Sequence, residues 1–182
     1  MICGIDPSLT STGMAFLDDD GVVRLLTVSS APGPIEPRLL EILRQVSANV
    51  RTVRPDLVVL EGLSMGSFGN TSALFEFAAL HYLIRIQLHS QGIPFHICSP
   101  SSLKKFVVGS AGPKIRKEHV LKAVFQRWGV DTQSNDEADA AGLAYVGAAI
   151  LDRIPAANEA QREVVAKIIA GPVKKTRRKA VA

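Results

Sequence analysis

The sequence has few cysteines, and neither of them lies in a CxxC motif or at a metal-site spacing. Its two cysteines, Cys3 and Cys98, sit in short apolar runs typical of strands. Cysteines in such runs usually behave as small hydrophobic residues, and a chain of 182 residues can bury a core without disulfides or structural metals. We therefore predict two reduced core thiols within one compact domain.

Long hydrophobic runs and leader features are also missing. No stretch approaches the roughly 18 uncharged apolar residues that a membrane-spanning helix needs. The opening segment, MICGIDPSLT, has neither a basic region nor a small-residue cleavage site. Low-complexity tracts are absent, and 47% of the residues are hydrophobic, which excludes a chain that is disordered throughout. We expect a cytoplasmic protein that does not cross a membrane.

Negative charge is scarce in two segments. Positions 101–130 hold seven Lys and Arg against the single acid Glu118, and residues 171–182 hold five cations and no acid. A field of this sign attracts a polyanion, and the commonest cytoplasmic polyanion is nucleic acid. Charge alone is equally compatible with solvated helix faces and a solubilising tail.

The hydrophobic pattern predicts an α/β fold. Strands are expected at 1–6, 12–17, 22–28, 56–62 and 93–98, and helices at 39–54, 71–89, 115–128, 137–153 and 156–170. Three hairpin strands followed by helices alternating with two strands describe a mixed five-stranded sheet flanked by helices. We expect residues 1–154 to form this domain, and residues 155–182 to add a C-terminal helix and a partly disordered basic tail.

The predicted helix at 71–89 is apolar on more than one face. One apolar stripe is enough to face a sheet, so the surplus needs a second cover. We favour a second copy of the chain over a helix sandwiched inside its own domain, and so predict a homodimer. The candidates for its interface are Leu74, Phe77, Tyr82 and Ile84.

Four carboxylates occupy positions where acids are costly or oddly placed. Asp6 and Glu61 each follow an apolar strand, at the carboxyl end where open sheets form their sites. Asp136 and Asp139 are three residues apart at a helix start, which places them on one face about 5–6 Å apart. The Ala/Gly run after Asp139 would let that helix pack closely on the sheet. Each acid alone is also explained as a cap or turn residue, but together they predict a cluster.

A carboxylate cluster requires protons or cations to offset its repulsion. Mg²⁺ takes oxygen ligands, and two such ions about 3.5–4 Å apart stabilise both the attacking and the leaving oxygen of a phosphoryl displacement. An acid cluster beside a basic field therefore favours a phosphodiesterase. We expect two Mg²⁺ ions, with Mn²⁺ as a substitute.

Several motifs, in this order and spacing, resemble those of the RuvC-type Holliday junction resolvases, in the ribonuclease H-like superfamily. They are GIDPSLTSTGMAF, DLVVLEG, LKKFVVG, GPKIRK and DEADAAGLA, and the resemblance covers about residues 1–150. It implies a ribonuclease H-like fold, a homodimer built partly on the helix after Glu61, and symmetric nicks in branched DNA that leave 5'-phosphate and 3'-hydroxyl ends. The metal ligands and catalytic residues that it implies are Asp6, Glu61, Asp136 and Asp139.

The resemblance also points to DNA contacts. Lys104 and Lys114 match family positions implicated in DNA binding, and Lys105, Arg116 and Lys117 lie in the same basic stretch. The chain departs from the family at Ser8, where a glycine is usual, and at Ser64, where an aromatic residue stacks on a junction base. Phe68, in the loop MGSFGN, is our candidate for that stacking role, with a buried loop anchor as the alternative. These departures leave the preference for junctions over other branched substrates open.

Three other functions fit parts of the sequence. An actin-like sugar kinase or ATPase has a similar first motif but needs two lobes, more than 182 residues supply. A nonenzymatic DNA-binding dimer would not need all four acids. A ribonuclease H-like nuclease acting on flap DNA, fork DNA or RNA–DNA hybrids stays open, because the acids encode the reaction and the surrounding surface encodes the substrate.

Overall fold

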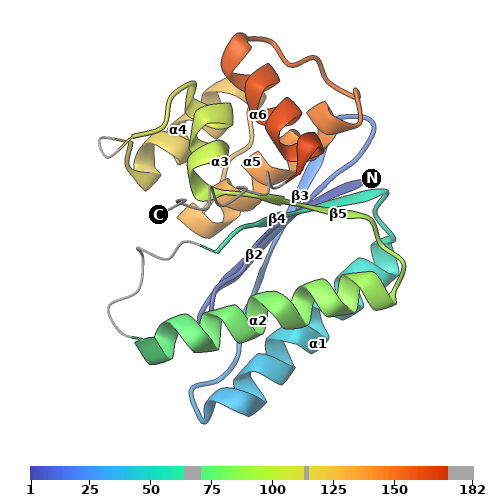
Figure 1. Ribbon diagram of the computed structural model, residues 1–182, viewed down its shortest axis with the longest axis vertical. Coiled ribbons are helices and arrows are strands. Elements are labelled where there is room, and N and C mark those ends of the chain that lie inside the picture. The colour runs from blue at the N-terminus through green and yellow to red at the C-terminus, as the bar shows by residue number, and fades with distance from the viewer. Residues whose placement is uncertain (64–70, 113–114, 172–182) are drawn as a thin grey trace, which may run out of the picture.

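The computed structural model describes residues 1–63, 71–112 and 115–171, and within these ranges the chain forms five strands and six helices (Figure 1). The strands are β1 (Ile2–Asp6), β2 (Thr12–Leu17), β3 (Val23–Val28), β4 (Leu57–Glu61) and β5 (Phe95–Cys98). The helices are α1 (Ile35–Val53), α2 (Thr71–Ser90), α3 (Pro100–Val108), α4 (Lys117–Trp128), α5 (Asn135–Ile150) and α6 (Glu159–Ala170). All predicted strands and helices are present, with ends shifted by a few residues.

The strands form one mixed sheet, as predicted. Their order is β3-β2-β1-β4-β5. β1 lies in the middle, antiparallel to β2 and parallel to β4, while β3 extends the antiparallel side and β5 the parallel side. The carboxyl ends of β1, β4 and β5 therefore meet at one edge of the sheet.

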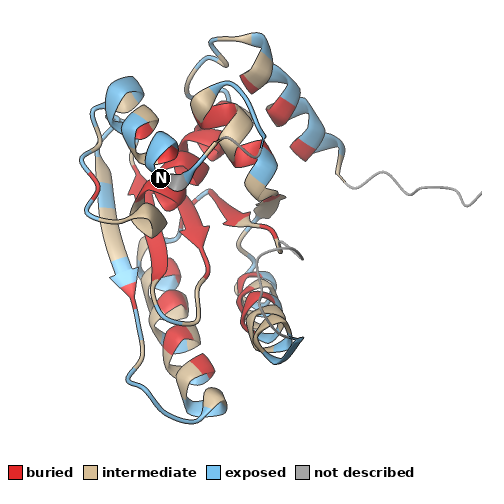
Figure 2. Ribbon diagram, turned by 90° about the vertical axis from the view of Figure 1, so that its left-hand side faces the viewer, coloured by how far each residue is buried: buried red, intermediate tan, exposed pale blue. Residues whose placement is uncertain are grey.

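Helices cover both faces of the sheet. α1 and α2 lie on one face, and α3 to α6 lie on the other (Figure 1). Alternate residues of each strand point to opposite faces of the sheet and belong to two separate hydrophobic clusters. Ile5 packs with Ile42 and Ile84 on the first face. Ile2 packs with Leu143 on the second face. Figure 2 shows the buried sides of the helices turned toward the sheet.

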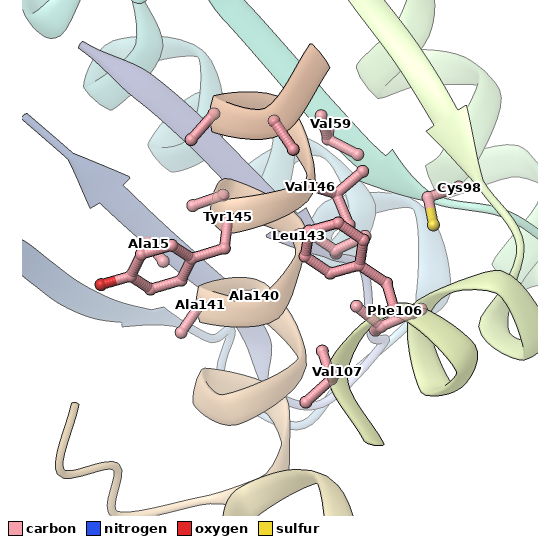
Figure 3. Close-up of a cluster of buried hydrophobic side chains, with 14 of the residues drawn as sticks. Ala15, Val59, Cys98, Phe106, Val107, Ala140, Ala141, Leu143, Tyr145 and Val146 are labelled. Atoms are coloured by element: carbon pink, nitrogen blue, oxygen red, sulfur yellow. The ribbon is translucent and has the colours of Figure 1, made fainter. Parts of the chain in front are cut away.

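α5 is buried on nearly all sides, because small residues let it rest directly on the strands. A Cβ added at Gly4 would lie 2.0 Å from the carbonyl oxygen of Ala140, and one added at Gly13 would lie 2.2 Å from that of Asp136. Figure 3 shows Phe106 of α3 packed beside Leu143 and Val146 of α5. The predicted close packing of this helix on the sheet is confirmed.

α2 has one buried face and one exposed apolar face. Leu80, Ile84 and Leu88 are buried in the first cluster, while Phe75, Tyr82 and Ile86 are 69%, 52% and 63% exposed. Ile84 is therefore part of the chain's own core, and the prediction that placed it at an interface is wrong. Leu74 and Phe77 are half-buried, and Tyr82 is exposed.

α3 was not predicted. The Ser99 hydroxyl accepts a hydrogen bond from the Ser102 N–H as the helix cap, Pro100 opens the helix, and Gly109 ends it at φ 94°. These capping signals are visible in the sequence. The helix spans only nine residues, and two lysines interrupt its buried stripe. The helical spacing of apolar residues therefore covers too few positions to predict a helix.

α6 belongs to the second core. Val164 and Ile168 pack into the cluster, and the buried Gln161 amide donates a 3.3 Å hydrogen bond to the carbonyl oxygen of Phe106. The basic tail, residues 172–182, lies outside the described residues, so the expected boundary between residues 154 and 155 stays a prediction. Cys3 and Cys98 are free and buried, as predicted. No helix in the described part of the chain is long and apolar enough to cross a membrane.

Candidate active site

The strand register places Asp6 and Glu61 side by side. Ile5 of β1 is the partner of Leu60 of β4, so the next residue of each parallel strand, Asp6 and Glu61, ends its strand at the same level. Glu61 is flanked on its other side by Cys98 of β5. The two carboxylates thus lie at the edge where three strands end.

The start of α5 brings the two aspartates to the same edge. Gly13 is the β2 partner of Asp6, and the main chain of Asp136 packs directly over Gly13. Asp139 follows one helical turn later and is buried. The structure therefore brings the four predicted carboxylates together from β1, β4 and α5.

Local hydrogen bonds hold the loop after Asp6 and the start of α5. The Ser8 N–H donates to the Thr12 hydroxyl over 3.1 Å, and that hydroxyl donates to the Ser8 carbonyl oxygen over 2.9 Å. In α5 the Ser134 hydroxyl accepts from the Glu137 N–H over 3.2 Å. The loop after Asp6 is thus closed with serine at position 8.

The cluster opposes ionisation of its innermost member. Asp6 is only 6% exposed. Burial raises the pKa of Asp6 well above its usual value, and the charges of Glu61, Asp139 and Asp136 and a hydrogen bond with the Glu61 carboxyl raise it further. The same edge raises the pKa of Cys98 to about 12, through burial first and then the charge of Glu61. The edge therefore concentrates acidic groups that oppose one another's ionisation.

The donor set fits a hard divalent cation. Carboxylate oxygens are the ligands that Mg²⁺ and Mn²⁺ prefer, and a cation beside Asp6 would offset the repulsion that raises its pKa. No three His, Cys, Asp or Glu side chains among the described residues are already arranged to coordinate a metal ion. Asp6, Glu61, Asp136 and Asp139 are the residues that would hold the ion.

The predicted DNA-binding cations are only partly described. Lys104 is half-buried on α3, a helix that packs against α5, and Arg116 is exposed just before α4. Lys105 forms an ion pair with Glu163 of α6. Lys117 is the first residue of α4, whereas Lys114 and Phe68 lie outside the described residues.

Sequence reasoning missed three residues that contact the site or the predicted DNA-binding lysines. Glu163 pairs with Lys105. Lys167 donates a 3.4 Å hydrogen bond to the Ser102 hydroxyl, and its charge offsets a small part of the rise in the pKa of Cys98 that burial and Glu61 cause. His81 of α2 lies with Nε2 2.9 Å from the main-chain oxygen of Glu61. Each contact joins elements that are distant in sequence, so no local sequence pattern predicts it.

Comparison with known proteins gives a consistent family. The family model for crossover junction endodeoxyribonuclease RuvC matches residues 2–147, a range that contains all four carboxylates and ends before α6. The crossover junction endodeoxyribonuclease RuvC of Nocardioides sp. is 30% identical over 150 residues, which cover 79% of this chain and 83% of the relative. That of Chloroflexus aurantiacus is 27% identical over 146 residues, covering 78% and 88%.

The fold has matches among solved structures as well. Thermus thermophilus RuvC in complex with a Holliday junction substrate aligns with a TM-score of 0.63 and 21% identity, covering 79% of this chain and 88% of that chain. At that identity the match shows the fold, and it agrees with the mixed sheet and flanking helices predicted from the sequence. The family match spans most of the chain, and the chain therefore belongs to the crossover junction endodeoxyribonuclease RuvC family.

Proposed function

We propose that this chain resolves four-way DNA junctions as a homodimeric, Mg²⁺-dependent endonuclease. Membership of the RuvC family supports the nuclease reaction. The observation that carries the proposal is the convergence of four carboxylates at one sheet edge, where burial and like charge raise the pKa of Asp6. Such a site calls for divalent cations.

The carboxylates are assigned the task of holding two metal ions. Bound there, Mg²⁺ would stabilise the attacking and leaving oxygens of the phosphodiester, and Mn²⁺ would replace it. Asp6 and Glu61 are held by neighbouring strands, and Asp136 and Asp139 by a helix seated on the same strands. This rigid support keeps the oxygen ligands at fixed positions while the substrate enters.

The cations of α3 and the start of α4 are assigned to the DNA backbone. Lys104 and Lys105 lie on the helix that packs against α5, and Arg116 is exposed nearby in sequence. Lys114 completes the set as a match to a family position, Lys117 as part of the same basic stretch, and Phe68 as a loop aromatic that can stack on an unpaired base. Contacts of lysine and arginine with phosphate position a duplex without reading its sequence.

The exposed face of α2 supports a dimer. Phe75, Tyr82 and Ile86 are more than half exposed, and with Ala79 their spacing of four, three and four residues puts them on one side of the helix. A second copy of the same chain is the occupant we assign. Four-way junctions have approximate two-fold symmetry, and paired nicks on opposing strands need two active sites related by the same symmetry.

Cleavage of a substrate panel tests this function. The panel comprises a four-way junction, flap, fork, linear duplex and RNA–DNA hybrid, each with Mg²⁺ or Mn²⁺, and Asp6→Asn serves as the inactive control. We expect paired nicks on the junction, with 5'-phosphate and 3'-hydroxyl ends. Preferential cleavage of flap, fork or hybrid would instead assign the chain to the wider group of ribonuclease H-like nucleases. We assign the chain to the cytoplasm, and a DNA substrate agrees with that location.

A further inference from the structure

His81 is a buried polar residue that the reaction scheme above does not use. It lies on the inner side of α2, beside Leu80 and Ile84, and its side chain is only 2% exposed. Nε2 is 2.9 Å from the main-chain oxygen of Glu61, which is the last residue of β4. A carbonyl oxygen only accepts, so Nε2 carries the proton and donates it. The imidazole therefore spans the space between α2 and the catalytic end of β4.

The rest of the ring is tightly confined. Nδ1 is buried and has no hydrogen-bond partner among the described residues. The ring also lies edge-on to Tyr82, with centroids 6.1 Å apart and planes at 75°. A buried polar atom without a partner costs free energy, and a plain apolar residue would fill the position without that cost. The contact with Glu61 is the only hydrogen bond that explains a histidine here within the described part of the chain.

The hydrogen bond acts on the peptide group next to a catalytic side chain. Glu61 ends β4. The N–H of the next residue, Gly62, donates a 2.7 Å hydrogen bond to the carbonyl oxygen of Cys98 on β5. His81 holds the Glu61 carbonyl, so both sides of this peptide plane are tethered. Fixing the plane limits ψ of Glu61 and with it the direction in which the carboxylate leaves the strand.

We propose that His81 is a positioning residue that holds the main chain at Glu61 from α2 and thereby aims the Glu61 carboxylate at the metal site. This inference rests on the proposed function for the role of Glu61 itself. It adds a residue of α2, the helix assigned to the dimer, to the support of the active site. A displacement of about 1 Å in a catalytic group can cost on the order of a hundredfold in rate, so a main-chain tether has a measurable effect.

Two substitutions of matched shape separate the hydrogen bond from packing. His81→Gln places an amide donor at about the reach of Nε2, whereas His81→Met has nearly the same length and volume but no donor. Both are made in the full chain and measured for folding by thermal melting without metal. The decisive readouts are the Mn²⁺ concentration that gives half of the maximal stabilisation against heat, and the junction dissociation constant and kcat.

We expect His81→Met to raise the half-stabilising Mn²⁺ concentration and to lower kcat about tenfold or more, with junction binding unchanged. His81→Gln should recover most of both effects. Values like those of the unaltered protein in a folded His81→Met variant would overturn the proposal, and so would equal losses in Met and Gln. If the Met variant does not fold, His81→Asn replaces it, because its shorter amide cannot reach the Glu61 carbonyl.

The Mn²⁺ measurement keeps this inference separate from the proposed function. An unaltered protein that binds Mn²⁺ but leaves four-way junctions uncut would contradict the resolvase assignment, while a Met–Gln difference in Mn²⁺ stabilisation would still support positioning by His81. A protein that cuts junctions with no such difference would contradict only the role of His81.

Discussion

Asp6 carries a large electrostatic cost, because burial and three neighbouring acids oppose its ionisation. The folded state therefore holds the Asp6 proton more tightly than the unfolded chain does. That difference favours the folded state at low pH and is lost as the pH rises through the raised folded pKa. Divalent cations would reverse the loss by compensating the charge.

Replacing Asp6 with asparagine should therefore stabilise the protein in metal-free buffer at neutral pH. We expect Asp6→Asn to melt above the unaltered protein at pH 8, by about 2–4 °C for each kcal/mol relieved, and the gap to close near pH 4. Adding Mn²⁺ should raise the melting temperature of the unaltered protein much more than that of the variant. A variant that is less stable at every pH would show that Asp6 is ionised at little cost.

The four carboxylates should be needed for cleavage and not for binding of the junction. Asp6→Asn, Glu61→Gln, Asp136→Asn and Asp139→Asn should each abolish cleavage while junction binding persists, because the amides keep the shape and lose the charge that holds the metals. Cleavage assays and gel-shift titrations measure the two properties. Glu137→Gln is the matched control, since Glu137 lies beside Asp136 but accepts hydrogen bonds from Thr27 and the Gln133 N–H. Near-normal turnover in the Asp6 and Glu61 variants would refute the assignment.

At the scale of elements, the edge that carries the four carboxylates depends on how closely α5 approaches the sheet. A side chain at Gly13 would meet the Asp136 carbonyl at 2.2 Å, so the first turn of α5 would have to move. We expect Gly13→Ala to destabilise the protein by about 1–3 kcal/mol, as overpacking does, and to reduce cleavage strongly by shifting Asp136. Gly33→Ala is the control, because its added Cβ would meet nothing within 4 Å. Equal denaturation midpoints for the two variants would contradict the close approach.

Because α2 has one buried and one exposed face, we predict different effects for substitutions at two of its isoleucines. Ile84 is 0% exposed and Ile86 is 63% exposed, although they are only two residues apart. Ile84→Glu should unfold the domain, whereas Ile86→Glu should leave a folded monomer that binds junctions weakly and nicks without coordination. Sedimentation at micromolar concentration and a paired-nick assay measure this. Val22→Glu, at an exposed apolar residue in the turn between β2 and β3, should change neither.

At the scale of the whole molecule, the sequence predicts best what local patterns determine. The strand-end positions of Asp6 and Glu61 and the three-residue spacing of Asp136 and Asp139 were enough to predict the cluster, because parallel strands end at a common edge. The packing of α6 onto α3 was not predictable, since it depends on contacts such as Gln161 to Phe106, 55 residues apart. The same reason hid the hydrogen bond from His81 to Glu61. Periodicity shows that a helix is amphipathic and leaves its partner unspecified.

The packing of α6 also places a negative charge on the surface that we expect to contact DNA. Lys105, a predicted phosphate contact, is paired with Glu163, and both side chains are partly exposed, 36% and 54%. An exposed pair of this kind contributes only about 0–1 kcal/mol, so a phosphate can replace Glu163 at little cost. We therefore expect Lys105 to contact DNA phosphates, with Glu163 as a weak competitor.

This competition predicts opposite effects for the two partners. Lys105→Ala should weaken binding to branched and linear DNA alike and reduce the slope of log affinity against log salt by about 1. Glu163→Gln should tighten binding to the same substrates a few-fold at low salt, because it frees Lys105 and removes a negative charge. In the double variant the gain from Glu163→Gln should largely disappear if Glu163 acts through Lys105, which a double-mutant cycle of dissociation constants measures. An unchanged salt slope in Lys105→Ala would place this lysine away from the DNA, and an undiminished gain in the double variant would mean that Glu163 repels the backbone directly.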